Sequence, residues 1–527
     1  MAKKKHKPRK KRTDSNHTPL DKLSRNGKSL RSPLTTLPGG TQFTSWVNDC
    51  IPNILWACIL ISHLERRECL DLFRSVPINA REKLPETEYK DSNLVHNFLS
   101  LLTAKQFDIL FEKVLANSKA KDLLSALLLV DCLPDRAHWE RVLDAPKPWH
   151  WQVLVRAVGI CFDHQSQEAT DVRWIKNMHI IVMGKVHFTE MFSERIEELR
   201  LYPDKGDMRS VRPSIRAMEL MTRMFEDPDR ERAAGEEPPS YTLPPKHNEQ
   251  FWKEMVEKTD CDIIEKLSLP VLPTKSIKVE ILDLYHAVSN HFDDTLSHTG
   301  IDAKHDAAFG LTLYALTLAL NSSMGYGHVL AEGRMVLRSI MEAFVFLRYL
   351  NFKNDPNLWK KYRNDGSGKT KLAFLKHCEA EELPDFIDLP RMENLVNEDM
   401  WLEFQDIELG QWAKSDLRSM ATECGVKDVY DKYYDWSSGY THSQWVCVRD
   451  TVFTVCANPL HRFHRIPVVP KMNMPSVIPD ACKLLNRMLD ELNNLYPSFK
   501  PRLKAYTKET VVEPTVEQTT AKESPAA

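Results

Sequence analysis

Residues 334–350 constrain the fold more than any other stretch of this chain. They read RMVLRSIMEAFVFLRYL, which is apolar on almost every side, as in a helix buried within a bundle. Arg334, Arg338 and Glu342 nevertheless fall at i, i+4 and i+8 and form one charged stripe along that helix. Because buried charges are costly unless they are paired, neighbouring helices are expected to supply partners. The stretch predicts a helical bundle with a polar centre.

The rest of the chain carries the same helical signature, with apolar residues at three- and four-residue spacing. We expect helices at residues 46–62, 65–76, 94–102, 105–116, 119–129, 149–161, 217–225, 279–296, 303–321, 328–350, 416–424, 428–454 and 479–495. The segment HIIVM at 179–183 fits either a short strand or a buried helical turn. Glycine is scarce, at 17 residues, and hairpin dipeptides between alternating strands are absent. We predict an all-α fold.

Changes in composition divide the chain into two multi-helix domains with disordered ends. Residues 1–40 are rich in basic and small polar residues and predict a disordered arm, and residues 500–527 predict a disordered tail. Residues 227–250 are charged and proline-rich and predict a linker. The expected domains are an N-terminal helical domain at 41–226 and a C-terminal helical domain at 251–499, which holds the polar centre.

Cysteine usage and hydropathy favour a cytoplasmic protein. The 11 cysteines are an odd number and include no C-x-x-C pair, which argues against a disulfide framework and against a cysteine-based structural zinc site. No apolar run reaches the roughly 18 residues that a membrane span needs. The N-terminus has no apolar segment typical of a secretory signal. We predict no metal site, no cofactor and no membrane partner.

The basic arm, residues 1–40, is the main indication of a partner. It carries twelve Lys or Arg against Asp14 and Asp21, a charge of +10, so a total of −2 leaves −12 on the rest of the chain. Such an arm binds nucleic acid through phosphates, acts as a nuclear address or only improves solubility, and the sequence leaves these alternatives open. The candidate phosphate contacts are Lys3, Lys4, Lys5, Lys7, Arg9, Lys10, Lys11 and Arg12.

A second stretch, YYDWSSGYTHSQW at 433–445, supplies partners for the charged stripe. On one helix Tyr434, Ser438 and His442 would lie on a single face, at i, i+4 and i+8. Glu342 could orient His442 and raise its basicity, while Arg338 could hold an anion. The tryptophans of the chain fall mostly within apolar helical patterns and are expected in the core.

These motifs resemble those of a known family. The pieces Arg338-Ser-x-x-Glu342, Arg348-Tyr349-Leu350 and Tyr434…Ser438…His442 are similar to an uncharacterised bacterial, all-helical family of the domain-of-unknown-function 5677 type, over about residues 280–460. The resemblance implies a helical domain with a shared polar centre and carries no activity with it.

Two functions of different class follow from these residues. In the first, the protein is a binding or regulatory module, a defence or stress component whose arm contacts nucleic acid and whose centre is structural or senses an anion. In the second, it is a metal-independent ribonuclease in which His442 is the general base, Glu342 orients it and Arg338 clamps phosphate. Ribonucleases of the HEPN type place Arg and His on one helix, a spacing found here at Arg173 and His179.

Two other signals are discounted. Residues 366–370, GSGKT, resemble the end of a phosphate-binding loop but lack its first glycine, because Arg363 stands there, so we expect a glycine turn between two helices. His291, Asp294 and His298 share a helix face that could offer metal ligands, yet the Glu-x-x-His pairs of a di-metal bundle are missing. An exposed polar face is the simpler interpretation.

Overall fold

The computed structural model describes residues 20–33, 45–86, 93–184, 193–202, 211–222, 246–263, 275–398, 401, 404, 406–468 and 474–506. It is 71% helical, with two small strand pairs among the described residues, which confirms the all-α prediction. The chain forms two compact units. Unit 1 comprises residues 1–264 and 455–464, and unit 2 comprises residues 265–454 and 465–527. Within the described residues, every helix is too short or too polar to cross a membrane.

Unit 1 is a cluster of helices around a tryptophan-rich core. Its elements are η1 (Leu20–Lys22), β1 (Ser24–Asn26), β2 (Ser29–Arg31), η3 (Trp46–Cys50), η4 (Ile51–Ile54), α1 (Leu55–His63), α2 (Arg66–Lys83), α4 (His96–Leu99), α5 (Ala104–Ala116), α6 (Ser118–Leu124), η5 (Ser125–Leu129), α7 (Arg136–Val142), α8 (His150–Phe162), α9 (Gln167–Val182), α10 (Ser193–Leu201), α11 (Val211–Thr222), α12 (Lys246–Lys258) and η11 (Pro459–His461).

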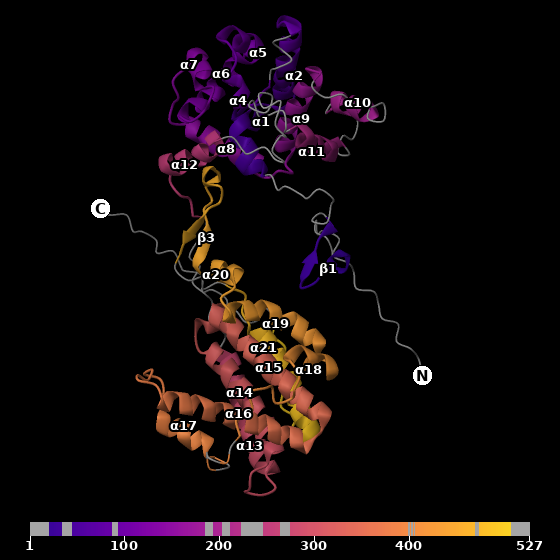
Figure 1. The fold of residues 1–527 in the computed structure, drawn as a ribbon, viewed down its shortest axis with the longest axis vertical. Coiled ribbons are helices and arrows are strands. Elements are labelled where there is room, and N and C mark those ends of the chain that lie inside the picture. The colour runs from indigo at the N-terminus through magenta and orange to yellow at the C-terminus, as the bar shows by residue number, and fades with distance from the viewer. Residues whose placement is uncertain are drawn as a thin grey trace, which may run out of the picture. The chain divides into compact units, whose positions relative to one another are not determined.

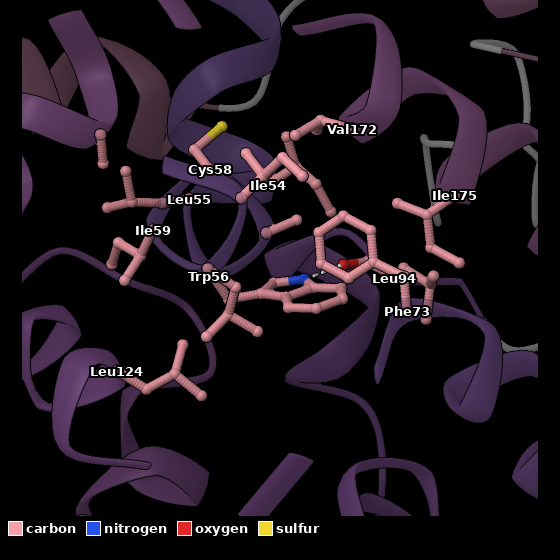
Figure 2. Close-up of a cluster of buried hydrophobic side chains, with 14 of the residues drawn as sticks. Ile54, Leu55, Trp56, Cys58, Ile59, Phe73, Leu94, Leu124, Val172 and Ile175 are labelled. Atoms are coloured by element: carbon pink, nitrogen blue, oxygen red, sulfur yellow. Dashed lines mark hydrogen bonds between the residues drawn. The ribbon is translucent and has the colours of Figure 1, made fainter. Parts of the chain in front are cut away.

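Helix α1 forms the centre of this unit because its residues 55–62 are buried on every side. Trp56 is fully buried, and its indole nitrogen donates a 2.9 Å hydrogen bond to the Leu94 carbonyl oxygen. Figure 2 shows this bond and the side chains around it. The rings of Phe73 and Phe111 meet Trp56 edge to face, with centroids 5.5 and 5.1 Å away.

Unit 2 is built around α15, which contacts α14, α18, α19 and α21 (Figure 1). Its elements are α13 (Lys275–Thr295), α14 (Ala303–Ser323), η9 (Tyr326–Val329), α15 (Ala331–Lys353), α16 (Pro356–Cys378), α17 (Leu389–Val396), α18 (Leu417–Glu423), α19 (Lys427–Thr441), α20 (Trp445–Val452) and α21 (Ile478–Leu495). Two short strands, β3 (Phe453–Val455) and β4 (Arg465–Pro467), pair with each other. The buried position of α15 agrees with its nearly all-round apolar sequence.

The structure corrects three local predictions. The expected single helix at 428–454 is broken between α19 and α20, where Ser443 adopts a positive φ of 49°. The segment GSGKT does not form a turn, since α16 runs through it without a break. Gly27-Lys28, which the sequence argument overlooked, closes the hairpin of β1 and β2, with Gly27 at φ 60°. Residues 179–182 of the ambiguous HIIVM segment are helical.

The predicted ends and joints fall largely outside the described residues. These include residues 1–19 of the basic arm, residues 223–245 of the expected linker and residues 507–527 of the expected tail. The predicted domain limits, 41–226 and 251–499, differ from the compact units: Lys246–Lys258 lies in unit 1, which also takes residues 455–464 from the C-terminal half.

Candidate functional site

Helices α15 and α19 pack against each other and carry all six residues predicted for the polar centre, His442 forming the C-terminal cap of α19. The start of α15 also packs closely against the preceding element, η9. A Cβ atom at Gly333 would lie 2.6 Å from the carbonyl oxygen of Gly327, so only glycine fits there without a shift of the backbone. This contact fixes the start of α15, where Arg334 begins the charged stripe.

Arg338 is the centre of the group that the structure brings together. Its guanidinium forms a 2.9 Å ion pair with Glu342 one turn later. The same guanidinium lies over the ring of Tyr434, 5.1 Å from the centroid, and Tyr430 stacks on Tyr434 with centroids 4.5 Å apart. The Nε atom of Arg338 is buried and has no hydrogen-bond partner within the described residues. Arg338, Glu342 and Tyr434 therefore form one interhelical contact that leaves a single donor unsatisfied.

Arg334 has a different role. It is buried, and it donates hydrogen bonds to the carbonyl oxygens of Leu330, at 3.0 Å, and Pro475, at 2.6 Å. Burial lowers the pKa of Arg334, while the nearby charges of Tyr440 and Asp450 act in the opposite direction. Because its donors face backbone carbonyls, Arg334 fastens the segment before α21 to the start of α15.

Ser438 and His442 do not join Arg338 and Glu342. Ser438 is buried within α19, whereas His442 is exposed at the point where α19 ends. In the part of the chain that the structure describes, the His442 imidazole makes no hydrogen bond or ion pair, and the only hydrogen bond of the residue runs from its backbone N–H to the Ser438 carbonyl. The predicted pairing of Glu342 with His442 is therefore absent. Helix α19 ends at Thr441, so His442 does not continue the helical face that carries Tyr434 and Ser438.

The corner between α19 and α20, residues 442–444, is tightly built. A Cβ atom at Gly439 would lie 2.6 Å from the Cys447 sulfur and 3.0 Å from the Gln444 side-chain oxygen. Next to it, the Tyr440 hydroxyl donates a 3.0 Å hydrogen bond to Asp450. Burial, and then this carboxylate, raise the pKa of Tyr440. We call residues 442–444 and the adjoining ends of α19 and α20 the α19–α20 corner.

Most tryptophans lie in the core as expected, but two exposed ones flank this corner. Trp436 is 55% exposed and Trp445 is 58% exposed. The guanidinium of Arg465, on β4, lies over the Trp445 ring at 5.5 Å from its centroid. The signal that could have identified this surface is the density of aromatic and polar residues in 433–445, which contains no aliphatic side chain.

The literal Arg–His spacing on α9 is structural. Arg173 pairs with Glu219 in the interior, Lys176 pairs with the same carboxylate, and His179 is fully buried. The discounted histidines also have local partners: His291 bonds to the Tyr496 carbonyl at 3.0 Å, and His298 accepts from the Gly300 N–H at 3.1 Å. His291 and His298 thus have partners within unit 2, and Arg173 is paired in the interior of unit 1.

One set of potential metal ligands was missed by the sequence argument. Cys261, Cys456, His461 and His464 come together in unit 1, with their ligand atoms all within 4.8 Å of one another. The absence of a C-x-x-C pair hid this set, since the first cysteine is 200 positions from His461. The candidate phosphate contacts of the arm, Lys3 to Arg12, lie outside the described residues.

Comparison with known proteins identifies part of the chain. Residues 313–454 match a family described as "Family of unknown function (DUF5677)", which confirms the resemblance drawn from the motifs. The matched stretch includes α15, α19 and α20, and with them the polar centre and the corner. No curated protein and no solved structure matches the chain.

Proposed function

We propose that this protein binds single-stranded nucleic acid, with the α19–α20 corner stacking on bases and the basic arm contacting phosphates. The observation that supports this function best is the pairing of Arg465 with the exposed ring of Trp445. An arginine beside an exposed indole is a combination that serves both parts of a nucleotide, because the ring stacks on a base and the guanidinium attracts phosphate.

The exposure of the two tryptophans favours this assignment. Burying a tryptophan contributes strongly to folding, so leaving Trp436 and Trp445 more than half exposed forgoes stability that the core could have gained. Every base has an aromatic face, and stacking on such a platform does not depend on sequence. A duplex hides these faces, and we therefore expect a preference for single strands.

The charge distribution suggests different roles for the basic arm and the α19–α20 corner in binding nucleic acid. The arm holds +10, while the remainder of the chain holds −12, so long-range attraction to a polyanion comes from the arm. His442, Arg449 and Arg465 are exposed around the corner and offer short-range contacts. We expect the arm to govern the dependence of affinity on salt and the corner to govern the preference for unpaired bases.

Binding is favoured over the ribonuclease chemistry because of how the polar centre is arranged. A phosphate clamp needs a guanidinium that is free to meet its ligand, whereas Arg338 is already paired with Glu342 and covered by Tyr434. A general base needs an orienting partner, and His442 makes no side-chain hydrogen bond within the described residues. On this account Arg338, Glu342 and Tyr434 hold α19 in place and so position the corner.

The test is oligonucleotide binding by the full-length protein, measured by fluorescence anisotropy with a labelled oligo-dT strand and a duplex of equal length. We expect the single strand to bind more tightly. Trp445→Ala should weaken its binding about 5-fold to 150-fold, the effect of about 1–3 kcal/mol per stacked base. Removing residues 1–40 should weaken binding to both nucleic acids and flatten the salt dependence.

Trp401→Ala is the matched control, because Trp401 is 63% exposed in the same unit but lies in another segment. It should bind like the wild type. Equal affinities of the wild type and Trp445→Ala for the single strand would remove the corner from the proposal, and equal binding of single strand and duplex would remove the stacking mechanism. Incubation with RNA in EDTA tests cleavage in parallel, and loss of RNA that requires His442 would support the enzyme instead.

A further inference from the structure

Two cysteines and two histidines of unit 1 converge outside the matched family. Cys261 follows α12, and Cys456, His461 and His464 lie in the segment 455–464. The Sγ atom of Cys261 lies 3.6 Å from Nδ1 of His461 and 3.2 Å from Nε2 of His464. The Sγ atom of Cys456 lies 3.5 Å from the same Nδ1 of His461. We call these four residues the Cys/His cluster.

The spacing of these atoms suits a tetrahedral zinc ion. With Zn–S bonds of about 2.3 Å and Zn–N bonds of about 2.0–2.1 Å, tetrahedral angles place neighbouring sulfur and nitrogen ligands about 3.5–3.6 Å apart. Two of the three Cys–His distances, 3.5 and 3.6 Å, equal this edge, and the third, 3.2 Å, is slightly shorter. Because the four ligand atoms all lie within 4.8 Å of one another, a single ion between them could contact all four.

Hydrogen bonding determines which nitrogen of His461 is free to bind. The Thr259 hydroxyl donates its one proton to the Met255 carbonyl, at 2.7 Å, so towards His461 it must accept. The His461 Nε2, 2.9 Å from that hydroxyl, therefore carries the imidazole proton. Its Nδ1 is left with a lone pair that points to both cysteines. Metal-binding histidines typically donate such a hydrogen bond from the ring nitrogen that does not bind the metal.

Two thiols converge on one nitrogen lone pair, although Cys261 also has Nε2 of His464 at 3.2 Å as an alternative acceptor. A single Nδ1 lone pair accepts one good hydrogen bond, yet the sulfur atoms of Cys261 and Cys456 lie at nearly equal distances from it. A metal ion in the middle satisfies all three groups at once. Cys456 is fully buried whereas Cys261 is exposed, which leaves a path by which an ion can enter from solvent.

Backbone contacts hold the two segments in register. The Cys456 N–H donates to the His464 carbonyl at 2.8 Å, and the Ala457 N–H donates to the Asp262 carbonyl at 2.7 Å. Between the two histidines, Arg462 and Phe463 both adopt left-handed conformations, at φ 53° and 50°. Two successive non-glycine residues of this kind cost energy and persist where the surroundings hold them in place.

From these observations we infer that the Cys/His cluster binds one structural zinc ion. Two thiolates and two neutral imidazoles around Zn²⁺ give a site without net charge, which suits its partly buried position. Binding converts two thiols to thiolates and releases two protons to solvent, one from Cys261 and one from Cys456. The N/S ligand set and closed tetrahedral geometry favour zinc over the oxygen-preferring cations Mg²⁺ and Ca²⁺.

The ion would fasten a distant segment of the chain to the end of α12. Cys261 and His461 are 200 positions apart, so the ion would close a long loop whose ends meet inside unit 1. Closing a long loop restricts the unfolded chain strongly, and the zinc site is therefore expected to stabilise unit 1. This role is independent of nucleic-acid binding at the α19–α20 corner, which lies in unit 2.

The experiment is a metal analysis of the full-length protein, produced in zinc-supplemented medium and desalted. Mass spectrometry of the elements should find about one zinc per chain, the stoichiometry of a closed four-ligand site. Cys261→Ser should lose most of it. Cys378→Ser is the matched control, because Cys378 is also exposed but lies outside the cluster, and it should keep its zinc.

Cobalt substitution of the wild type gives a second readout that does not depend on a variant folding. Co²⁺ bound by two thiolates should produce sulfur-to-cobalt charge-transfer bands and the visible bands of a tetrahedral ion, and added Zn²⁺ should abolish both. A wild type without zinc and without these cobalt bands would overturn the inference. So would a disulfide between Cys261 and Cys456 in the freshly purified protein, or equal zinc loss in both serine variants.

Discussion

Arg338 and Glu342 satisfy each other across one turn of α15, at 2.9 Å, and the aromatic ring of Tyr434 covers the guanidinium from α19. This arrangement joins α15, the helix around which unit 2 is built, to the helix that ends at the corner. The polar centre therefore stabilises the packing of the two helices, because the Arg338 guanidinium is already paired with Glu342 and covered by the Tyr434 ring.

Replacing Arg338 should therefore weaken folding. Arg338→Ala leaves the partly buried Glu342 carboxylate without its cation and removes the contact with Tyr434, so we expect the free energy of unfolding to fall by about 1–3 kcal/mol. Urea denaturation followed by circular dichroism measures this. Arg338→Met, which keeps the length of the side chain, should recover part of the loss in combination with Glu342→Gln. An unchanged unfolding midpoint in Arg338→Ala would contradict the structural role.

His442→Ala should leave stability almost unchanged. The side chain is exposed, and no hydrogen bond of its imidazole is found among the described residues, so the free energy of unfolding should stay within about 0.5 kcal/mol of the wild type. Thermal unfolding followed by circular dichroism provides the comparison. A marked drop in the melting temperature would mean that the imidazole has a partner at the corner.

Two glycines of α16 should respond to alanine in opposite directions. A Cβ atom at Gly368 would lie 2.7 Å from the Asp406 carbonyl oxygen, so Gly368→Ala should destabilise the fold by about 1–3 kcal/mol. A Cβ atom at Gly366 would have no other atom within 4 Å. Gly366→Ala should therefore stabilise the fold by up to about 1 kcal/mol, because alanine has the higher helix propensity. Urea denaturation of both variants tests the pair, and equal effects would show that Gly368 does not meet residue 406.

These two glycines also show where sequence reasoning reached its limit. Periodicity identified the buried helix at 334–350 and the all-α fold, because both depend on local apolar spacing. The GSGKT segment looked like a turn, since nothing local reveals that Gly368 is needed for a backbone that approaches from residue 406. Likewise, Cys456, His461 and His464 are neighbours in sequence, but their fourth partner, Cys261, is 200 positions from His461, a separation that no local pattern reveals.

The polar centre was predicted in part for the same reason. Helical spacing placed Arg338 and Glu342 on one stripe that was expected to meet the helix of Tyr434, whereas the structure pairs the two charges with each other and lays Arg338 over the Tyr434 ring. It failed for His442 because the helix ends there, at a corner where Gly439 approaches Gln444 and Cys447 too closely for any larger residue. The exposed Trp445 was missed because an aromatic residue in a helical pattern is usually part of the core.

Acid should destabilise the protein through two buried histidines. Burial, with the neighbouring His96, lowers the pKa of His247 to about 3, and burial with Arg334 and Lys278 lowers the pKa of His328 to about 4. Between these values and 6.5 the unfolded chain binds more protons than the folded one, so stability is present near neutrality and is lost as the pH falls. Each group should contribute up to about 1.4 kcal/mol for each pH unit below 6.5.

Urea denaturation at a series of pH values from neutral to mildly acidic tests this dependence. His247→Gln and His328→Gln each remove one titrating group, and each should reduce the slope of unfolding free energy against pH. His298→Gln is the control, because His298 is exposed and should leave the slope as it is. Parallel curves for all three variants and the wild type would show that neither buried histidine governs the response to acid.

The central claim is that the α19–α20 corner contacts bases, and photochemical crosslinking tests it most directly. The full-length protein would be irradiated with a single-stranded oligonucleotide and digested, and the crosslinked peptides would be located by mass spectrometry. We predict crosslinks in peptides that contain Trp436 or Trp445, reduced in Trp445→Ala and retained in Trp401→Ala. Crosslinks confined to other segments, or none at binding concentrations, would contradict the account.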